Sequence, residues 1–226
     1  MTREATELMT ATMDELIRSG EEQWLELWIR GPKELSLEPT FHVRDKAPDL
    51  TFPDHTGAPR SLSSFWQDRP ALILFWRQYG CGCGAERAGR LKEELSQYRE
   101  AGAEVVVVGQ GEPERAAAYR ESHGLDCTFL CDTEEQGYRA YGLTEFTVPE
   151  ILFDAPEEFW SHGRDVGESF ITARRESGRS LVDNPWRRAG EFVVDSTGML
   201  RLTYRWQYCE DFPDPRVHVL AIKQSL

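Results

Sequence analysis

The sequence contains no long hydrophobic run and no excess of basic residues. Its longest apolar stretches, 70–76 and 105–108, have the length of a β-strand, whereas a membrane helix needs about 20 apolar residues. Asp and Glu number 39 against 26 Lys and Arg, which gives a formal net charge of −13. Because nucleic acids and anionic membrane surfaces attract clustered positive charge, this balance predicts neither of them as a partner.

A secretion signal and several common catalytic motifs are also missing. Residues 1–16, MTREATELMTATMDEL, are polar and acidic and lack the basic and apolar regions of a signal peptide, so we expect a reducing cytoplasm. The sequence holds no GxGxxG, GxSxG or HExxH pattern and no phosphate-binding P-loop. The cysteines are odd in number, which does not predict a structural disulfide framework. They are Cys81, Cys83, Cys127, Cys131 and Cys209.

Buried strands alternate with helices through the middle of the chain. The expected strands are 71–76, 104–109 and 127–132, and the expected helices are 83–100, 112–122 and 134–141. Two further β runs flank a turn at 196–198 and predict a hairpin over 191–206, followed by a closing helix over 214–223. We therefore predict an α/β, thioredoxin-like, three-layer α/β/α sandwich. Its central sheet is mixed, with three parallel strands and the C-terminal hairpin.

The pattern divides the chain into two predicted parts. Residues 1–43 form an N-terminal helical extension, because 3–29 carry apolar residues at helical spacing and Gly31-Pro32 ends the helix. Such an arm packs on the main domain or on a second subunit, which would make a homodimer. Residues 44–226 form the thioredoxin-like domain, with an insertion at about 150–186 that lies over one end of the sheet.

The most informative feature is the pair Cys81 and Cys83 within FWRQYGCGCGAER, at residues 75–87. This stretch joins a buried strand to a helix, and a helix N-terminus lowers the pKa of a thiol. Arg77, and also Arg87, would add positive charge near the thiolate. The sequence therefore predicts a reactive, partly exposed thiol at the carboxyl edge of a parallel sheet, where open α/β folds place their sites.

The sequence evidence for a role of the remaining cysteines, or for a metal site, is less specific. Cys127 and Cys131 lie on one face of a strand and are expected in the core, and the spacing of Cys209 does not require it as a remote resolving thiol. A CxC disulfide closes a tight ring, so it favours a transient redox bond over a structural one. Two thiolates would also suit copper(I), as in a metal carrier, although a lone CxC is weak evidence for a metal site and we assign no metal ligands.

Five blocks of sequence, in this order, resemble one known family. They are APDLTFPDHTG (47–57), ALILFWRQYGCGC (71–83), EVVVVGQGEPE (104–114), FLCDTEEQGYRAYGL (129–143) and GEFVVDSTGMLRLTYR (190–205). With a terminal helix after DFPDP, they resemble the peroxiredoxin-like 2 branch of the AhpC/TSA proteins over about residues 44–224. The spacing of Cys81 and Cys83 is one residue shorter than the CxxC pair usual in that branch.

The resemblance implies a thioredoxin fold and thiol-dependent redox activity without a bound cofactor. The favoured hypothesis is an oxidoreductase that reduces a peroxide, an endoperoxide or a disulfide, and that a thioredoxin- or glutaredoxin-like dithiol regenerates. The helix start favours Cys83 as the stabilised thiolate, while Cys81 is the more exposed thiol, so both stay candidates. The alternatives are a non-catalytic binding module with this fold and a copper carrier.

Five further residues are candidates for binding substrate or stabilising an anion. Arg77 precedes the cysteine pair, and Arg188, with its neighbour Arg187, lies where thioredoxins carry a cis-proline that faces the thiols. Tyr79 and Trp186 are the aromatic residues expected to line the pocket.

Overall fold

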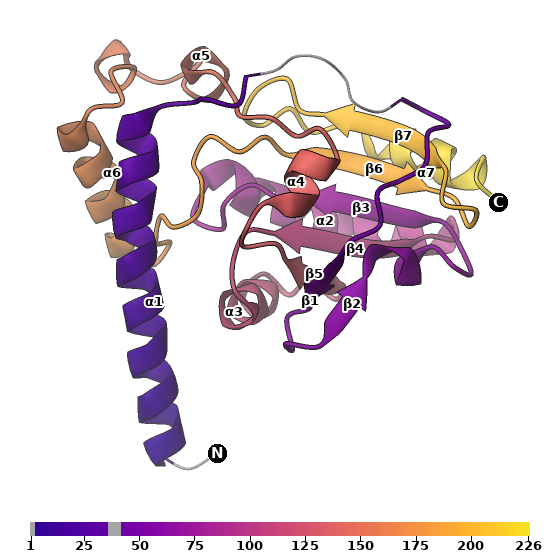
Figure 1. The fold of residues 1–226 in the computed structure, drawn as a ribbon, viewed down its shortest axis with the longest axis horizontal. Helices are drawn as coiled ribbons and strands as arrows, with labels where there is room; N and C mark the ends of the chain where they lie inside the picture. Colours follow the sequence, from indigo (N-terminus) through magenta and orange to yellow (C-terminus); the bar gives the residue numbers. More distant parts are fainter. Residues whose placement is uncertain (1–2, 36–41) are drawn as a thin grey trace.

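Five strands form one mixed sheet in the order β5-β4-β3-β6-β7 (Figure 1). The computed structural model describes residues 3–35 and 42–226. The parallel strands are β3 (Ala71–Phe75), β4 (Glu104–Gly109) and β5 (Thr128–Cys131). The hairpin strands are β6 (Gly190–Val194), antiparallel to β3, and β7 (Leu200–Arg205). The predicted thioredoxin-like sheet is therefore confirmed.

Helices and short strands cover the two faces of this sheet. One face carries α2 (Gly82–Glu100), α3 (Pro113–His123) and α7 (Pro215–Lys223). The other carries β1 (Thr51–Pro53), β2 (Pro59–Ser61), η1 (Leu62–Phe65) and α4 (Gln136–Ala140). Every residue of β3 is buried because it lies in the middle of the sheet with a hydrophobic core on each side, which explains its continuous apolar sequence.

The N-terminal helix has almost the bounds that its apolar pattern predicts. It is a single helix, α1 (Arg3–Arg30), which ends where Gly31 takes a φ of +70°. It lies beside α6 (Arg164–Glu176) at one end of the sheet (Figure 1). The ring of Trp28 stacks between Trp24 and Trp186, with centroid distances of 5.3 and 5.1 Å. This apolar cluster joins α1 to the segment that the sequence identifies as an insertion.

The predicted insertion, 150–186, begins within α5 (Val148–Ile151) and also contains η2 (Glu157–Phe159). Pro149 lies in the first turn of α5, and none of the peptide bonds in the described part of the chain is cis. Across residues 3–35 and 42–226, no helix is long and apolar enough to cross a membrane.

Candidate functional site

Cys81 and Cys83 lie at the start of α2, as the sequence predicts. Cys81 is the N-cap residue, with φ −69° and ψ 140°, and Cys83 lies in the first helical turn. Cys81 is partly exposed, whereas Cys83 is only 2% exposed. Amide groups of the first turn have no carbonyl partner within the helix, so this position favours a negative charge on a nearby sulfur.

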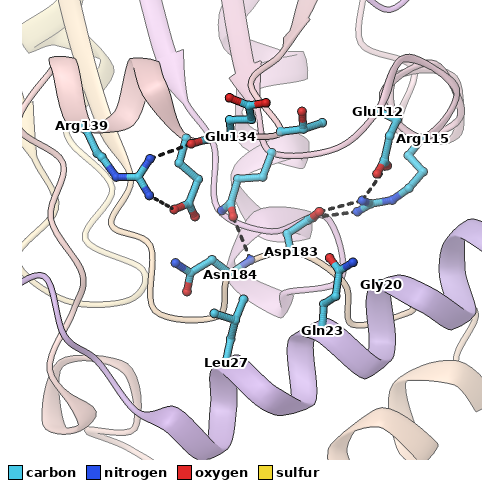
Figure 2. A pocket seen from close by; sticks show the side chains of 12 residues that line it. Gly20, Gln23, Leu27, Glu112, Arg115, Glu134, Arg139, Asp183 and Asn184 are labelled. Carbon is cyan, nitrogen blue, oxygen red and sulfur yellow. Dashed lines mark hydrogen bonds and ion pairs between the residues drawn. The ribbon is translucent and has the colours of Figure 1, made fainter.

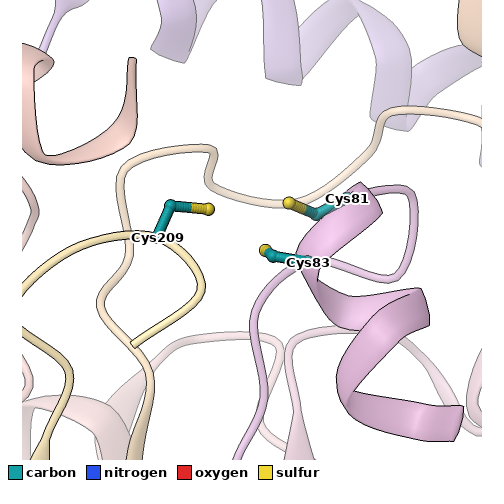
Figure 3. A group of neighbouring side chains, drawn as sticks. All are labelled: Cys81, Cys83 and Cys209. Atoms are coloured by element: carbon teal, nitrogen blue, oxygen red, sulfur yellow. The ribbon is translucent and has the colours of Figure 1, made fainter. Parts of the chain in front are cut away.

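A third thiol, that of Cys209, completes the site (Figure 3). It comes from residues 206–214, the loop between β7 and α7, and it is buried. The sulfur atoms of the three cysteines all lie within 4.8 Å of one another, and no disulfide joins them. We name this group the thiol cluster. Sequence spacing gave no reason to include Cys209, and the contact is therefore a finding of the structure.

Strand register explains why distant segments meet here. Phe75 pairs with Gly190 across β3 and β6, and Gly190 pairs with Arg205 across β6 and β7. The chain that leaves β3, the chain that enters β6 and the chain that leaves β7 therefore share one edge of the sheet. The predicted hairpin already implied this arrangement, because the hairpin fixes the edge of the sheet at which β7 ends and the loop with Cys209 begins.

A buried arginine faces the thiol cluster. Arg77 is 2% exposed, and its guanidinium donates to the carbonyl of Arg187 at 3.2 Å and lies 5.3 Å from the centre of the Phe146 ring. Within the described residues it forms no ion pair with a carboxylate. Burial alone works to lower the pKa of Arg77, but negative charge on the cluster, from Cys209 and Cys81 first, raises it overall. The cluster is therefore the counter-charge of this guanidinium.

The three thiols do not share the negative charge equally. Hydrogen bonds from the thiols of Cys209 and Cys83, together with the charge of Arg77, hold the pKa of Cys81 well below its ordinary value, although burial opposes this. The hydrogen bonds of Cys83 with Cys209 and Cys81, together with burial, raise the pKa of Cys83. The hydrogen bond that Cys209 donates to Cys81, together with burial, raises the pKa of Cys209 to about 12. These directions favour Cys81, the more exposed sulfur, as the thiolate, rather than Cys83 as its position in the helix suggested.

The other arginines named from the sequence have different partners. Arg188 is buried and lies over the same Phe146 ring as Arg77, 4.2 Å from its centre, and it donates to the carbonyl of Trp206 and the carboxylate of Glu150. Arg187 is paired with Glu135 and Glu34, and Arg87 with Glu191 and Glu94. Those two guanidiniums are neutralised by carboxylates and add no free charge at the thiols.

The two aromatic candidates lie on different sides of the turn. Tyr79 stacks on Tyr119 at 4.5 Å, and together with Gly80 it lines a cavity of about 480 Å³ next to the thiol-bearing turn. Trp186 is fully buried against Trp28 and donates from its indole to the carbonyl of Leu27. Its ring has no surface left for a substrate, so its role in this structure is packing, which corrects the expectation that it lines the pocket.

A second, polar cleft of about 340 Å³ lies between α1 and the loops that follow β4 and β5 (Figure 2). Its two arginines are already paired: Arg115 with Asp183 at 2.6 Å, and Arg139 with Glu135 at 3.3 Å. None of the three cluster cysteines lines it. The cleft therefore offers no reactive group of its own.

The three sulfurs of the thiol cluster are also the atoms that would bind a metal ion. Three sulfur atoms within 4.8 Å suit a soft ion such as copper(I). The guanidinium of Arg77 opposes this use, because a fixed buried positive charge repels a cation in a medium of low dielectric constant. The same charge favours a bare thiolate, so the electrostatics of the site fit redox chemistry better than metal binding.

Comparisons with known proteins agree with the fold. The profile of the AhpC/TSA family matches residues 43–159. Peroxiredoxin Bcp of Escherichia coli is 25% identical over 99 residues, which are 44% of this chain and 63% of that protein. The chloroplastic thioredoxin-like protein AAED1 of Arabidopsis thaliana is 28% identical over 169 residues, covering 73% of this chain and 65% of that protein. The matches thus span less than two thirds of these relatives.

A solved structure extends the likeness of fold to most of the chain. Peroxidoxin BcpB of Mycobacterium tuberculosis superposes with a TM-score of 0.57 at 16% identity, covering 81% of this chain and 97% of that one. The sequence profile covers the segment that contains β3, α2 and the paired cysteines. This chain therefore belongs to the AhpC/TSA family of thioredoxin-fold, peroxiredoxin-like proteins.

Proposed function

We propose that the chain is a thiol-dependent oxidoreductase that reduces a peroxide or endoperoxide, or a disulfide, with Cys81 as the attacking thiolate and Cys83 as its neighbouring thiol. One observation carries the proposal: the partly exposed Cys81 is the N-cap residue of a helix and lies beside a buried arginine that has no carboxylate partner among the described residues. Membership of the AhpC/TSA family and the likeness to peroxiredoxins support it.

The first chemical step needs only the thiolate and an O–O bond. The Cys81 sulfur attacks one oxygen of a hydroperoxide, an S–O bond forms, the O–O bond breaks and the leaving alkoxide takes a proton to become an alcohol. Cys81 is then a sulfenic acid. A second thiol attacks that sulfur, an S–S bond forms and water leaves. An external dithiol, of thioredoxin or glutaredoxin type, returns both cysteines to the reduced state by exchange.

The test mixes the reduced protein with hydrogen peroxide or cumene hydroperoxide and follows the loss of free thiols. We expect Cys81→Ser to abolish the fast reaction and Cys83→Ser to leave its first step in place. Cys127→Ala is the matched control, because that thiol lies in the hydrophobic core and its burial raises its pKa to about 12. An undiminished reaction in the double variant Cys81→Ser/Cys83→Ser would refute the proposal.

The copper carrier is the second candidate, because Cys209 supplies a third sulfur that the sequence pattern did not place in the site. Titration of the reduced protein with copper(I) against a competing chelator separates the two functions. The redox proposal expects weak copper(I) binding together with fast peroxide-dependent thiol loss. Tight binding that needs all three sulfurs, without reaction with peroxide, would favour the carrier instead.

A further inference from the structure

We propose that Cys209 is the resolving thiol of this site, so that oxidation joins Cys81 to Cys209 rather than to Cys83. The inference rests on the proposed function for its first step, the oxidation of Cys81. It goes beyond that function by assigning the disulfide partner and a role for the inserted segment. The geometric basis is that the sulfur of Cys209, from a separate loop, lies within 4.8 Å of both other sulfurs (Figure 3).

The backbone of α2 disfavours a bond between the two neighbouring cysteines. The sulfurs of Cys81 and Cys83 also lie within 4.8 Å of each other, but a disulfide between cysteines two residues apart closes a tight ring, which would distort the start of α2. That would break the hydrogen bond from the amide of Ala85 to the carbonyl of Cys81, which is 3.2 Å long. Cys209 lies outside the helix, and its sulfur reaches bonding distance by movement of its own loop, while α2 stays intact.

The loop that carries Cys209 is held in place by the inserted segment. The amide of Cys209 donates to the carbonyl of Glu150 at 2.8 Å, and the rings of Tyr208 and Phe153 meet edge to face at 5.1 Å. Arg188 donates to the carbonyl of Trp206 and to the Glu150 carboxylate, and so joins this loop to α5. The insertion therefore acts as a support that holds Cys209 against Cys81, and Arg188 is a positioning residue.

The reaction balances with the groups in the cluster and one peroxide. The thiol of Cys209 attacks the sulfur of the Cys81 sulfenic acid, the S–S bond forms, and the sulfenic oxygen leaves as water with the thiol proton and its own. The two thiols together lose two electrons, which the peroxide has accepted. Cys83 stays reduced throughout. The external dithiol then reduces the Cys81–Cys209 bond in the same way as any exposed disulfide.

The test identifies the disulfide directly. The full chain is treated with one equivalent of cumene hydroperoxide, free thiols are blocked, and the unreduced digest is analysed by mass spectrometry. We expect a Cys81–Cys209 peptide pair in the wild type and in Cys83→Ser. In Cys209→Ser we expect at least a tenfold slower formation of disulfide and a dimedone adduct on Cys81. A dominant Cys81–Cys83 pair that Cys209→Ser leaves unchanged would overturn the inference.

A second oxidant separates this inference from the proposed function. Diamide oxidises neighbouring thiols without a peroxide step, and we expect it to give the same Cys81–Cys209 pair. If diamide gives that pair and peroxides do not react, peroxide reduction fails and the pairing stands. If both oxidants give Cys81–Cys83, or neither gives a disulfide at Cys209, the pairing fails whatever the activity toward peroxides.

The supporting role of Arg188 has its own readout. We expect Arg188→Met to slow disulfide formation several-fold more than sulfenic acid formation at Cys81, because it loosens the loop with Cys209. Arg216→Gln is the matched control, since that arginine pairs with Asp214 on the surface next to the same loop. Equal slowing of both steps would assign Arg188 a general structural role instead.

Discussion

At the scale of single residues, Arg77 defines the chemistry of the site. Removing a guanidinium from water costs several kcal/mol unless an anion compensates for the lost hydration, and arginine does not deprotonate to avoid that cost. Its contacts are a carbonyl oxygen, the Phe146 ring and the thiol cluster. On the proposed function, a thiolate at Cys81 supplies that anion, so a reactive sulfur and a stable buried arginine would depend on each other.

The substitution Arg77→Met tests this dependence, because it keeps an unbranched side chain and removes the charge. In the wild type the pKa of Cys81 is lowered, so its alkylation should slow only at a lower pH than that of an ordinary thiol. The variant keeps the hydrogen bonds from Cys209 and Cys83 but loses the charge of Arg77, so the pKa of Cys81 rises and alkylation by iodoacetamide at neutral pH slows several-fold. The pH profile of the alkylation rate measures the shift.

Arg90→Gln is the control for that experiment, because Arg90 lies on the exposed side of α2 and pairs with Glu86. Its profile should match that of the wild type. Identical profiles for Arg77→Met and the wild type would contradict the assignment of Arg77 as the counter-charge of the thiolate.

At the scale of elements, α1 approaches α6 closely because a glycine lies at the contact. A Cβ at Gly167 would lie 2.6 Å from a methyl carbon of Leu25 and 2.8 Å from the Trp28 ring. Gly89 in α2 is the opposite case, since a Cβ there meets nothing within 4 Å. The two positions share a helical backbone and differ only in the space around them.

This contrast predicts opposite effects of the same substitution. Gly89→Ala should raise the free energy of unfolding by about 0.5–1 kcal/mol, because alanine loses less backbone freedom in a helix. Gly167→Ala gains the same amount but overpacks the contact, which costs about 1–3 kcal/mol, so the net effect should be destabilising. Urea unfolding followed by tryptophan fluorescence measures both. A gain in stability for Gly167→Ala would show that α1 is not closely packed on α6.

Local patterns in the sequence predicted most of these elements. The runs ALILF and EVVVVG marked buried strands, and a turn with Gly198 marked the hairpin, because burial on both faces and a left-handed φ leave strong local signals. Cys81 and Cys83 were singled out by another local signal, their spacing where a buried strand leads into a helix. Cys209 was not, since its place depends on strand register and on an irregular loop, neither of which has a periodic pattern.

At the scale of the whole molecule, one buried ionic group connects the sheet to two helices. Glu191 of β6 accepts from Arg87 of α2 at 2.9 Å and lies 2.9 Å from a ring nitrogen of His218 in α7. It is 1% exposed. Burial works to raise the pKa of Glu191, but the charge of Arg87 and the hydrogen bond from His218 lower it to about 2. The layer of helices over this face is thus connected to the sheet by charge as well as by apolar packing.

This group makes the stability of the fold depend on acid pH. The pKa of Glu191 is lowered on folding, so its contribution is fully present above the ordinary carboxyl value of about 4.5 and is lost as the pH falls toward about 2. The shift corresponds to about 3 kcal/mol. In Glu191→Gln the free energy of unfolding should be lower by about that amount at neutral pH, and the difference from the wild type should close between about pH 4.5 and 2.

Glu86→Gln is the control for this prediction. It removes an exposed partner of Arg90, and its stability should follow the wild-type curve. Urea unfolding at a series of pH values measures the three curves, and a constant gap between Glu191→Gln and the wild type would mean that Glu191 does not titrate with folding.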